Sequence, residues 1–318
     1  MELDYGEGGQ KMNRLVIAFR PDLQFRANSD TICAMDDNRN VLFQYTFHDV
    51  TVQVIWEFDV PACEYQWDAA QLETMRRSDG TVAFLEVGND VASFLPKPGS
   101  VHASATLVPD GTLTVSTTYN QDAAGRPGVR TNANSVLGTA STANWVWMGK
   151  IVALVYTKHS SGTGMHISRR GMNSGTTTNA NGGWMYRTSN TTKDLYSMIA
   201  TEGIQKKTTA GVANVDVMQM FQFNGTVWYY LSESVDGQDA VVSTFDTGYS
   251  GTFSLDGSTD FPLGLGGYFG GTDATTGREF ADITIHELRV IDGTAQDAIN
   301  LSVFLVDKWW PTPCLINC

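Results

Sequence analysis

The sequence predicts a mostly antiparallel β fold with one short helix near its C-terminus. Only 17% of the 318 residues are charged and 31 are glycine, so Ser, Thr, Asn and Gly must supply most of the polar surface, as suits strands and turns. Segments rich in β-branched and aromatic residues recur between turn signals. A single convincing helical pattern is present, and it lies close to the end of the chain.

The first part of the chain combines short strands with less regular structure. Strands are expected at 15–19, 41–47 and 50–58, after which Pro61 closes the segment. Residues 71–77 are expected to form one or two helical turns. The Ser78-Asp79-Gly80 sequence then predicts a turn.

From residue 101 the strand pattern is persistent. The expected strands are 105–107, 113–119, 145–157, 215–223, 226–231 and 280–291. The second hairpin among them turns at Asn224-Gly225, because Asn and Gly tolerate the left-handed backbone of a tight turn. Alternation in the last strand predicts His286 on the opposite face from Glu287, together with Leu288 and Val290.

The helical pattern follows that strand directly. Thr294 and Asp297 have the spacing of a capping box. Pro311 then ends the segment, because proline cannot continue a helix. The apolar residues between these two points keep helical spacing and form one face: Ala298, Leu301, Leu305 and Trp309.

Composition excludes two classes of partner. The chain has 21 Lys and Arg against 34 Asp and Glu, a formal net charge of -13. A surface this acidic repels phosphate, so nucleic acid is not an expected partner. No apolar run approaches the 18 residues of a membrane span, and residues 1–13 do not have the pattern of a signal peptide.

Four cysteines are present, and none is in a C-x-x-C pair. Free thiols are the preferred expectation for a chain without an export signal. The alternatives left open are a Cys33–Cys63 bridge and a Cys314–Cys318 bridge.

Four segments together resemble the concanavalin A-like (laminin G-like) jelly-roll superfamily, in particular its phage and bacterial members. The segments are Tyr65-Gln-Trp-Asp-Ala-Ala70, Gly125-Arg-Pro-Gly-Val-Arg130, the Asn224-Gly225 hairpin, and 263–309 with its Gly-Gly strand, Glu-bearing strand and helix ending in Lys-Trp. The resemblance covers roughly residues 63–312, and it is carried by the order of the motifs. It implies an antiparallel β-sandwich domain, which is expected at 63–318. Residues 1–62 lie outside the resemblance and are expected to form an added N-terminal β segment that serves docking or assembly.

The superfamily includes glycoside hydrolases, which need paired carboxylates on one strand face. The closest match is Glu57 and Asp59, which share a face, but Pro61 interrupts the pattern and the pair lies outside the matched region. No Gly-x-Ser-x-Gly elbow, P-loop or dinucleotide fingerprint is present. The sequence therefore predicts no catalytic residues and no enzyme activity, and His286 is expected to be a structural histidine.

Calcium is common in this superfamily at loop rims. The acidic loop residues that could contribute are Asp236, Asp239, Asp256, Asp260 and Asp273. No EF-hand spacing joins them, and ordinary turn chemistry is the preferred explanation of each. No cofactor is predicted, and calcium remains the open alternative.

Sugar binding in such folds depends on exposed aromatic rings that stack on the apolar face of a sugar. The candidate contacts are Trp184 and Tyr186 after Asn181, followed by Trp228 and Tyr230. The competing interpretation of the first pair is aromatic packing under a loop. For Trp228 and Tyr230, strand alternation must bury at least one residue of the 228–230 run.

The first functional hypothesis is a non-enzymatic, lectin-like structural virion protein, such as a capsid decoration or a component of a tail or fibre. Its expected partners are other virion proteins, in a homo-oligomer or a capsid or tail lattice, and a host or environmental glycan. It would be made in the host cytoplasm and carried on the virion. The alternatives are a secreted bacterial carbohydrate-binding or glycoside hydrolase-like protein and an assembly protein without a ligand.

Overall fold

The computed structural model of the chain divides into two compact units, one of residues 1–58 and 310–318 and one of residues 59–309. The sequence places 1–62 in an N-terminal segment and 63–318 in the sandwich, and this division stays a prediction. The described residues are 24–27, 31–35, 41–46, 62–82, 86–98, 106–109, 117–132, 135–139, 147, 149–160, 164–169, 183–188, 192–198, 202–208, 214–223, 228–237, 241–242, 263–267 and 280–310.

In the smaller unit the described residues form one three-stranded antiparallel sheet. Its strands are β1 (Gln24–Ala27), β2 (Thr31–Met35) and β3 (Val41–Thr46), in that order. The third matches the strand expected at 41–47. The strands expected at 15–19 and 50–58 lie outside the described residues.

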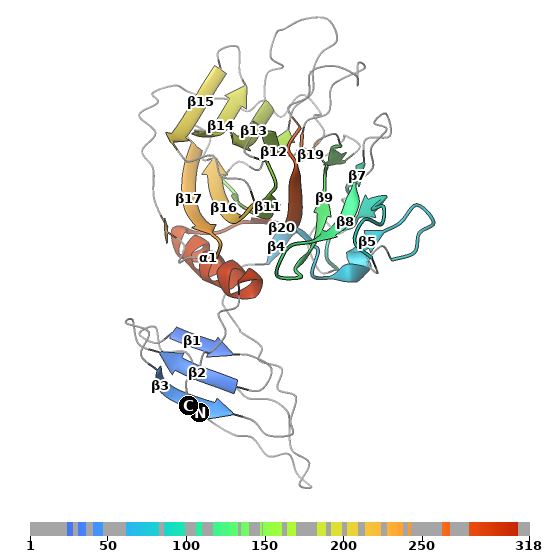
Figure 1. Ribbon diagram of the computed structural model, residues 1–318. Helices are drawn as coiled ribbons and strands as arrows, with labels where there is room; N and C mark the ends of the chain where they lie inside the picture. The colour runs from blue at the N-terminus through green and yellow to red at the C-terminus, as the bar shows by residue number, and fades with distance from the viewer. Residues whose placement is uncertain are drawn as a thin grey trace, which may run out of the picture. The chain divides into compact units, whose positions relative to one another are not determined.

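The larger unit is built on two antiparallel sheets (Figure 1). The first has the order β18-β17-β16-β11-β20-β9-β8, with β4 also paired to β20. Its strands are β18 (Val241–Val242), β17 (Trp228–Val235), β16 (Val215–Phe223), β11 (Ile151–Lys158), β20 (Ile283–Ile291), β9 (Pro127–Arg130), β8 (Thr118–Gln121) and β4 (Cys63–Asp68). We call this the first sheet.

The second sheet has the order β15-β14-β13-β12-β19-β10-β7. Its strands are β15 (Glu202–Thr208), β14 (Thr192–Met198), β13 (Gly183–Thr188), β12 (Gly164–Arg169), β19 (Leu263–Leu265), β10 (Leu137–Gly138) and β7 (Val108–Pro109). A separate pair is formed by β5 (Met75–Arg76) and β6 (Ser93–Phe94). The predicted antiparallel β-sandwich is confirmed.

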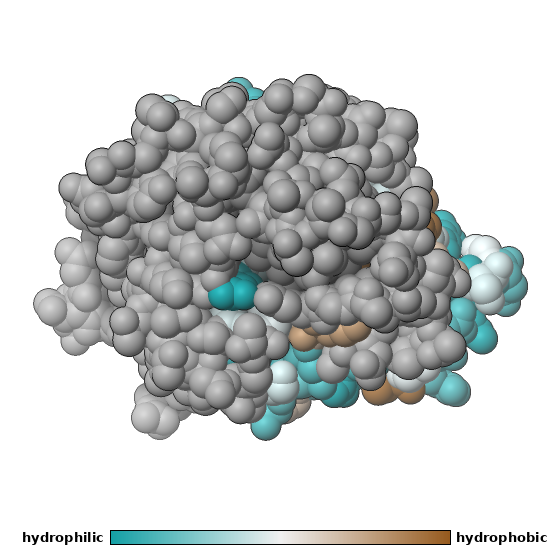
Figure 2. Space-filling model, turned by 90° about the horizontal axis from the view of Figure 1, so that it is seen from above, coloured by the Kyte–Doolittle hydropathy of each residue, from teal (hydrophilic) through white to brown (hydrophobic). Residues whose placement is uncertain are grey.

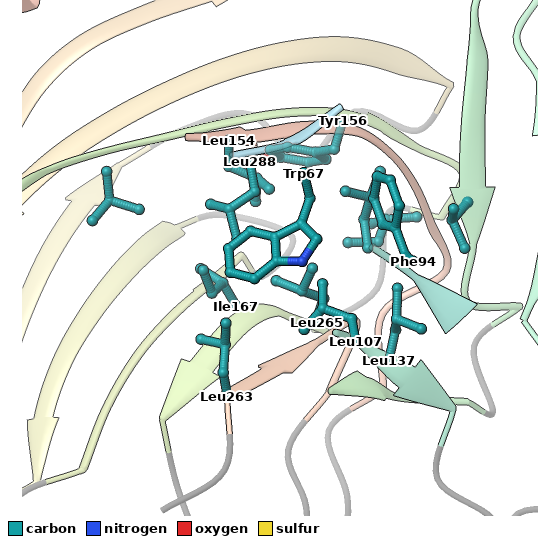
Figure 3. Close-up of a cluster of buried hydrophobic side chains, with 14 of the residues drawn as sticks. Trp67, Phe94, Leu107, Leu137, Leu154, Tyr156, Ile167, Leu263, Leu265 and Leu288 are labelled. Atoms are coloured by element: carbon teal, nitrogen blue, oxygen red, sulfur yellow. The ribbon is translucent and has the colours of Figure 1, made fainter. Parts of the chain in front are cut away.

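The core lies between the inner faces of the two sheets, where Trp67 of β4 is fully buried. Figure 3 shows Trp67 among apolar side chains from both sheets. Its neighbours in this view are Leu154, Tyr156 and Leu288 of the first sheet, Leu137, Ile167, Leu263 and Leu265 of the second, and Phe94 and Leu107. Burying a large side chain contributes roughly 1.5–3 kcal/mol, so this layer supplies much of the driving force for folding.

Strand β20 departs from the predicted alternation. Ile283 and Ile285 lie in the core with Leu288 and Val290. The pairing of β20 with β11 shifts register at Val155/Tyr156, so that Val155 pairs with Glu287 and Tyr156 with Ile285. The residue skipped between them is His286. This β-bulge lets two consecutive residues leave the core, and the predicted split of His286 and Glu287 is therefore wrong.

The helix α1 (Ala295–Trp309) confirms the C-terminal prediction. The amide nitrogen of Thr294 donates to Asp297 Oδ2 at 2.6 Å, and the amide of Asp297 donates to Thr294 Oγ1 at 3.3 Å, as a capping box requires. The helix contacts β16 and β17. It therefore covers the outer face of the first sheet, which we call the helix face.

Two local predictions near the start of the sandwich are also borne out. The turn at Ser78-Asp79-Gly80 is present, with Gly80 at φ +80° and Thr81 donating to Asp79. Residues 71–77 form a single 3-10 turn, Leu72–Thr74, which runs directly into β5. No described helix is long and apolar enough to cross a membrane.

Large apolar side chains are sparsely exposed on the described surface. They are Val87, Val108, Ile299 and Val303. In the view of Figure 2 the coloured, described surface is mostly hydrophilic and has small hydrophobic areas. Scattered apolar residues of this kind are normal on a protein surface.

Candidate functional site

The first two predicted sugar contacts are core residues. Trp184 and Tyr186 lie on β13 and are each 0% exposed. The ring of Trp184 packs against Trp147 at a centroid distance of 5.5 Å and Phe221 at 6.1 Å. The hydroxyls of Tyr186 and Tyr156 lie 3.2 Å apart. Neither ring presents a face to a ligand, so the structure corrects this prediction in favour of aromatic packing.

The remaining predicted contacts lie near the edge of the first sheet or outside the description. Trp228 and Tyr230 are in β17, where they pair in register with Phe223 and Phe221. The edge strand β18 pairs only with Ser232 and Glu233 of β17. Residues 228–230 therefore have no described strand neighbour on that side. Asn181 lies outside the described residues.

A buried ionic cluster occupies the helix face around Glu287, which is 0% exposed. Its Oε2 accepts hydrogen bonds from Lys308 Nζ at 2.6 Å and Trp309 Nε1 at 2.7 Å, both from the last turn of α1. Its Oε1 accepts from Gln66 Nε2 at 2.8 Å and from Arg289 Nε. We call Glu287, Asp68, Gln66, Arg289, Lys308 and Trp309 the Glu287 cluster.

The two carboxylates of this cluster differ in acidity although both bind Lys308, whose Nζ lies 2.6 Å from Asp68 Oδ2. Burial by itself would raise the pKa of Glu287, but Arg289 and Lys308 together lower it to about 2. Burial and the nearby Glu287 charge raise the pKa of Asp68. Glu287 is therefore held ionised at neutral pH, bonded to two cations and an indole.

A second cluster on the helix face is centred on the Arg126 guanidinium, which bonds Asp122 through Nε and Asp216 through Nη2. Its Nη1 donates to the backbone oxygen of Trp309 at 2.7 Å. A third side chain, His286, lies with its Nε2 3.9 Å from Asp122 Oδ2. We call Arg126, Asp122, Asp216, Thr157 and His286 the Arg126 cluster. It ties the β8–β9 turn, β11, β16, β20 and the end of α1 together.

His286 is bonded at both ring nitrogens. Its Nδ1 lies 2.7 Å from the Pro127 carbonyl, which can only accept, so this nitrogen carries hydrogen. Its Nε2 lies 2.7 Å from Thr157 Oγ1, which in turn donates to Asp216 at 2.5 Å. Burial lowers the pKa of His286, against the opposing effects of the Pro127 bond and the two aspartates. The expected structural role of this histidine fits these contacts.

The same three ligand-type residues have the spacing of a metal site. The ligand atoms of Asp122, Asp216 and His286 all lie within 4.8 Å of one another. The guanidinium of Arg126 already bonds both carboxylates, and both nitrogens of His286 have partners. A metal ion could bind these three groups only by displacing Arg126, so the donor set does not fit a resident metal.

Sequence reasoning did not find either cluster, although several members lie in the motifs it used. Arg126 is part of the Gly125–Arg130 segment, and Lys308 and Trp309 are the end of the helical motif. Their hydrogen-bond partners are Asp68, Asp122, Asp216 and Glu287, and only the folded chain brings these residues together. The β-bulge at His286 has no signature in the sequence, and simple alternation places His286 and Glu287 on opposite faces of the strand.

Of the remaining predicted candidates, few are described. Asp236 is exposed in a turn with φ +51° and accepts a hydrogen bond from the Asp216 amide, which is turn chemistry. Asp239, Asp256, Asp260 and Asp273 lie outside the described residues, as do Glu57 and Asp59. Cys63 has a free thiol in the described part of the chain, and burial raises its pKa. The Cys33–Cys63 bridge stays an open alternative, because the side chain of Cys33 lies outside the description.

No family model matches the chain, and comparison with the curated proteins gives no match. Solved structures show distant likeness. Domain 4 of AbnA, a GH43 extracellular arabinanase from Geobacillus stearothermophilus solved with arabinotriose, matches with TM-score 0.42 at 11% identity over 76% of this chain and 99% of that one. The Ruminococcus gnavus IT-sialidase CBM40 bound to α2,3 sialyllactose gives 0.34 at 12%, over 48% and 81%.

A third structure, the binding domain of botulinum neurotoxin serotype D/C VPI 5993, gives 0.43 at 8% identity over 78% of this chain and 53% of that one. Likeness this distant assigns no ligand. The class of protein is given by the chain's own layers: an antiparallel β-sandwich whose outer face is covered by a C-terminal helix.

Proposed function

We propose that this β-sandwich is a non-catalytic, glycan-binding module of a virion structural protein. The proposal that the module is non-catalytic rests on the cations that pair with its clustered carboxylates. The carboxylates of the Glu287 cluster and the Arg126 cluster are neutralised from within the fold, through Arg289 and Lys308 in one and Arg126 in the other. Carboxylates held in this way have no free oxygen poised as nucleophile or general acid.

The proposed ligand surface is the edge of the first sheet at residues 228–230. Trp228, Tyr229 and Tyr230 are consecutive aromatic residues in β17, beyond the reach of the described part of β18. Aromatic rings at a sheet edge suit stacking on the apolar face of a pyranose. Asn181 is the proposed amide contact. Trp184 is excluded from this surface by its burial.

The experiment for the ligand is a glycan array on the full chain, followed by titration calorimetry with any saccharide that binds. Trp228→Ala is expected to reduce affinity at least about tenfold, the loss of roughly 1.4 kcal/mol. Trp184→Phe is the matched control, because it keeps an aromatic core residue and is expected to bind normally. Equal binding by both variants and the wild type would remove residue 228 from the site.

The experiment for the virion role is fractionation of assembled particles. The protein should sediment with particles in a fixed copy number and be released only when they are disrupted. A protein found free in the culture medium, with no particle-bound fraction, would contradict the virion role and favour a secreted carbohydrate-binding protein. Hydrolysis of a bound glycan would contradict the non-catalytic role.

A further inference from the structure

Lys308, in the last turn of α1, contacts two buried carboxylates through one ammonium group. Its Nζ lies 2.6 Å from Asp68 Oδ2 and 2.6 Å from Glu287 Oε2. The side chain of Asp68 is 2% exposed and that of Glu287 is 0% exposed. A primary amine and a carboxyl group are the two reactants of an amide bond. The folded chain holds them in contact, which removes the entropic cost of bringing them together.

Lys150 has a similar arrangement at the protein surface and provides a comparison. Its Nζ lies 2.7 Å from Glu64 Oε1 and 2.9 Å from Asp292 Oδ2, and these side chains are 25% and 75% exposed. Water therefore solvates both carboxylates and competes with them for Lys150. Around Asp68 and Glu287 the fold excludes most of this water, which favours condensation over the reverse reaction, hydrolysis.

The carboxyl group of Asp68 has the features of an electrophile. Burial and the neighbouring Glu287 charge raise its pKa, which favours the uncharged acid that an amine can attack. Its second oxygen, Oδ1, accepts a hydrogen bond from the Ala70 amide at 3.1 Å. A backbone N–H in this position stabilises the negative charge that develops on a carboxyl oxygen during attack.

Glu287 is placed to transfer a proton. Its Oε2 accepts from Lys308 Nζ, while Gln66 and Arg289 both donate to its Oε1. These bonds fix the carboxylate against the amine. Arg289 also remains as a counter-charge when Lys308 loses its own charge, so Glu287 stays paired throughout a reaction of its neighbours.

We propose that Lys308 and Asp68 condense to an intramolecular isopeptide bond, with Glu287 as the proton relay. A proton first passes from Nζ to Oδ2 along their hydrogen bond. The Nζ lone pair then forms a bond to Cγ of Asp68, and negative charge collects on Oδ1 beside the Ala70 amide.

The remaining steps release water. Glu287 takes a second proton from the nitrogen and gives it to Oδ2. The bond between Cγ and Oδ2 breaks, the carbonyl re-forms at Oδ1, and Glu287 is again a carboxylate. One ammonium and one carboxylate are consumed, and one amide and one water molecule are formed. The step needs no ligand, so it is independent of glycan binding.

The new bond joins elements from the two ends of the larger unit. Asp68 ends β4, the first described strand of that unit, and Lys308 lies 240 residues further along the chain. A cross-link that closes so long a loop restricts the unfolded chain strongly. The ionic contacts of Lys308 described above belong to the chain before this reaction.

The test is the intact mass of the reduced and denatured chain. The wild type is expected to be lighter than its sequence by one water molecule. Lys308→Arg keeps the cation without a primary amine, and Asp68→Ala has no carboxyl group, so both are expected at their full sequence mass. Lys150→Arg is the matched control, and it is expected to lack one water molecule as the wild type does.

Peptide mapping of the wild-type chain locates the bond and does not depend on the folding of any variant. A branched peptide is expected that joins the segment of Asp68 to the segment of Lys308, with the Lys308–Trp309 bond resistant to trypsin. Asp68 can also lose water by closing on the amide nitrogen of Ala69, which leaves an unbranched peptide. The branched peptide therefore distinguishes the isopeptide bond from this side reaction.

Glu287→Gln tests the relay, because it keeps both Lys308 and Asp68. This variant is expected to stay at its full sequence mass. Condensation as complete as in the wild type would remove Glu287 from the reaction.

Two results overturn the isopeptide bond itself. One is a wild-type chain at its full sequence mass although a cooperative urea transition shows that it is folded. The other is a missing water molecule without the branched peptide between Asp68 and Lys308. Neither result bears on the glycan array, so this proposal and the glycan-binding proposal fail separately.

Discussion

The indole Nε1 of Trp309 donates a 2.7 Å hydrogen bond to Oε2 of the fully buried Glu287. This contact joins the last residue of α1 to the bulged strand at the centre of the first sheet. Trp309 also accepts from Arg126 through its backbone oxygen and packs against His286 at a ring distance of 5.3 Å. The end of the helix is therefore held by both polar clusters.

Glu287→Gln should destabilise the sandwich by about 3–5 kcal/mol. The amide has the same shape but no charge, and it leaves Arg289 and Lys308 beside each other without the carboxylate that pairs them. Urea unfolding followed by tryptophan fluorescence measures the change. Asp292→Asn is the control, since this carboxylate is 75% exposed in its pair with Lys150 and should cost no more than about 1 kcal/mol.

The low pKa of Glu287 predicts a loss of stability in acid. Its folded pKa of about 2 lies below its ordinary value of 4.5, so the stability it contributes is complete above 4.5 and is lost as pH falls toward 2. The shift corresponds to roughly 3 kcal/mol. Asp68, whose pKa is raised, takes up a proton earlier on the same descent and offsets part of this loss.

The measurement is the urea midpoint of unfolding at several pH values between 6 and about 2. The wild-type slope over the acid limb should flatten in Glu287→Gln, which has no group to protonate at this position. Parallel slopes in the two proteins would show that other carboxylates control acid unfolding.

Arg126→Met should cost about 3 kcal/mol, because Asp122 and Asp216 would lose the cation between them. Arg126→Lys should fall between the methionine variant and the wild type, since a single ammonium cannot reach both carboxylates and the Trp309 oxygen together. Thermal unfolding ranks the three proteins. Equal melting temperatures for lysine and arginine would show that charge alone matters here.

Hydrogen exchange provides the local readout for the same variants. The amides of the last turn of α1 should exchange faster in Arg126→Met, while those of the β11–β16 ladder should change in proportion to global stability alone.

EDTA should leave the melting temperature of the wild type unchanged, because Arg126 and not a metal ion neutralises Asp122 and Asp216. A shift with EDTA would contradict Arg126 as the cation of this cluster.

Gly128→Ala should destabilise the fold by about 1–3 kcal/mol through overpacking. A Cβ at this position would meet the methyl of Thr284 and lie 2.9 Å from the Ile285 oxygen. Thr284→Ser removes that methyl and keeps the hydroxyl, so the double variant should recover part of the loss. Additive losses in the double variant, measured by urea unfolding, would argue against this contact.

Local patterns predicted part of the fold: β16 and the C-terminal helix were expected, whereas β12, β13, β14 and β15 of the second sheet were not. The strand at 215–223 coincides with β16, and the Thr294–Asp297 cap lies where the spacing placed it. These features depend on residues close together in the sequence. The prediction that Trp184 is an exposed sugar contact is wrong. A tryptophan beside a loop has the same sequence pattern whether its ring faces solvent or the opposite sheet.

The two ionic clusters were not predictable in the same way. Glu287 and Gln66 are 221 residues apart in the chain, and Arg126 and Asp216 are 90 apart. No short-range spacing relates such residues. Their faces also depend on the register between β11 and β20, which is set by pairing and not by the strand's own pattern.

His286 behaves as a one-residue insertion in an otherwise regular strand. Without it, Ile283, Ile285, Leu288 and Val290 would alternate strictly with Thr284, Glu287 and Arg289. A relative shorter by this residue would keep every hydrophobic position and lose only the imidazole that links the Pro127 carbonyl to Thr157. Gap placement at this position in an alignment would thus distinguish chains that carry the histidine link from chains that share the core alone.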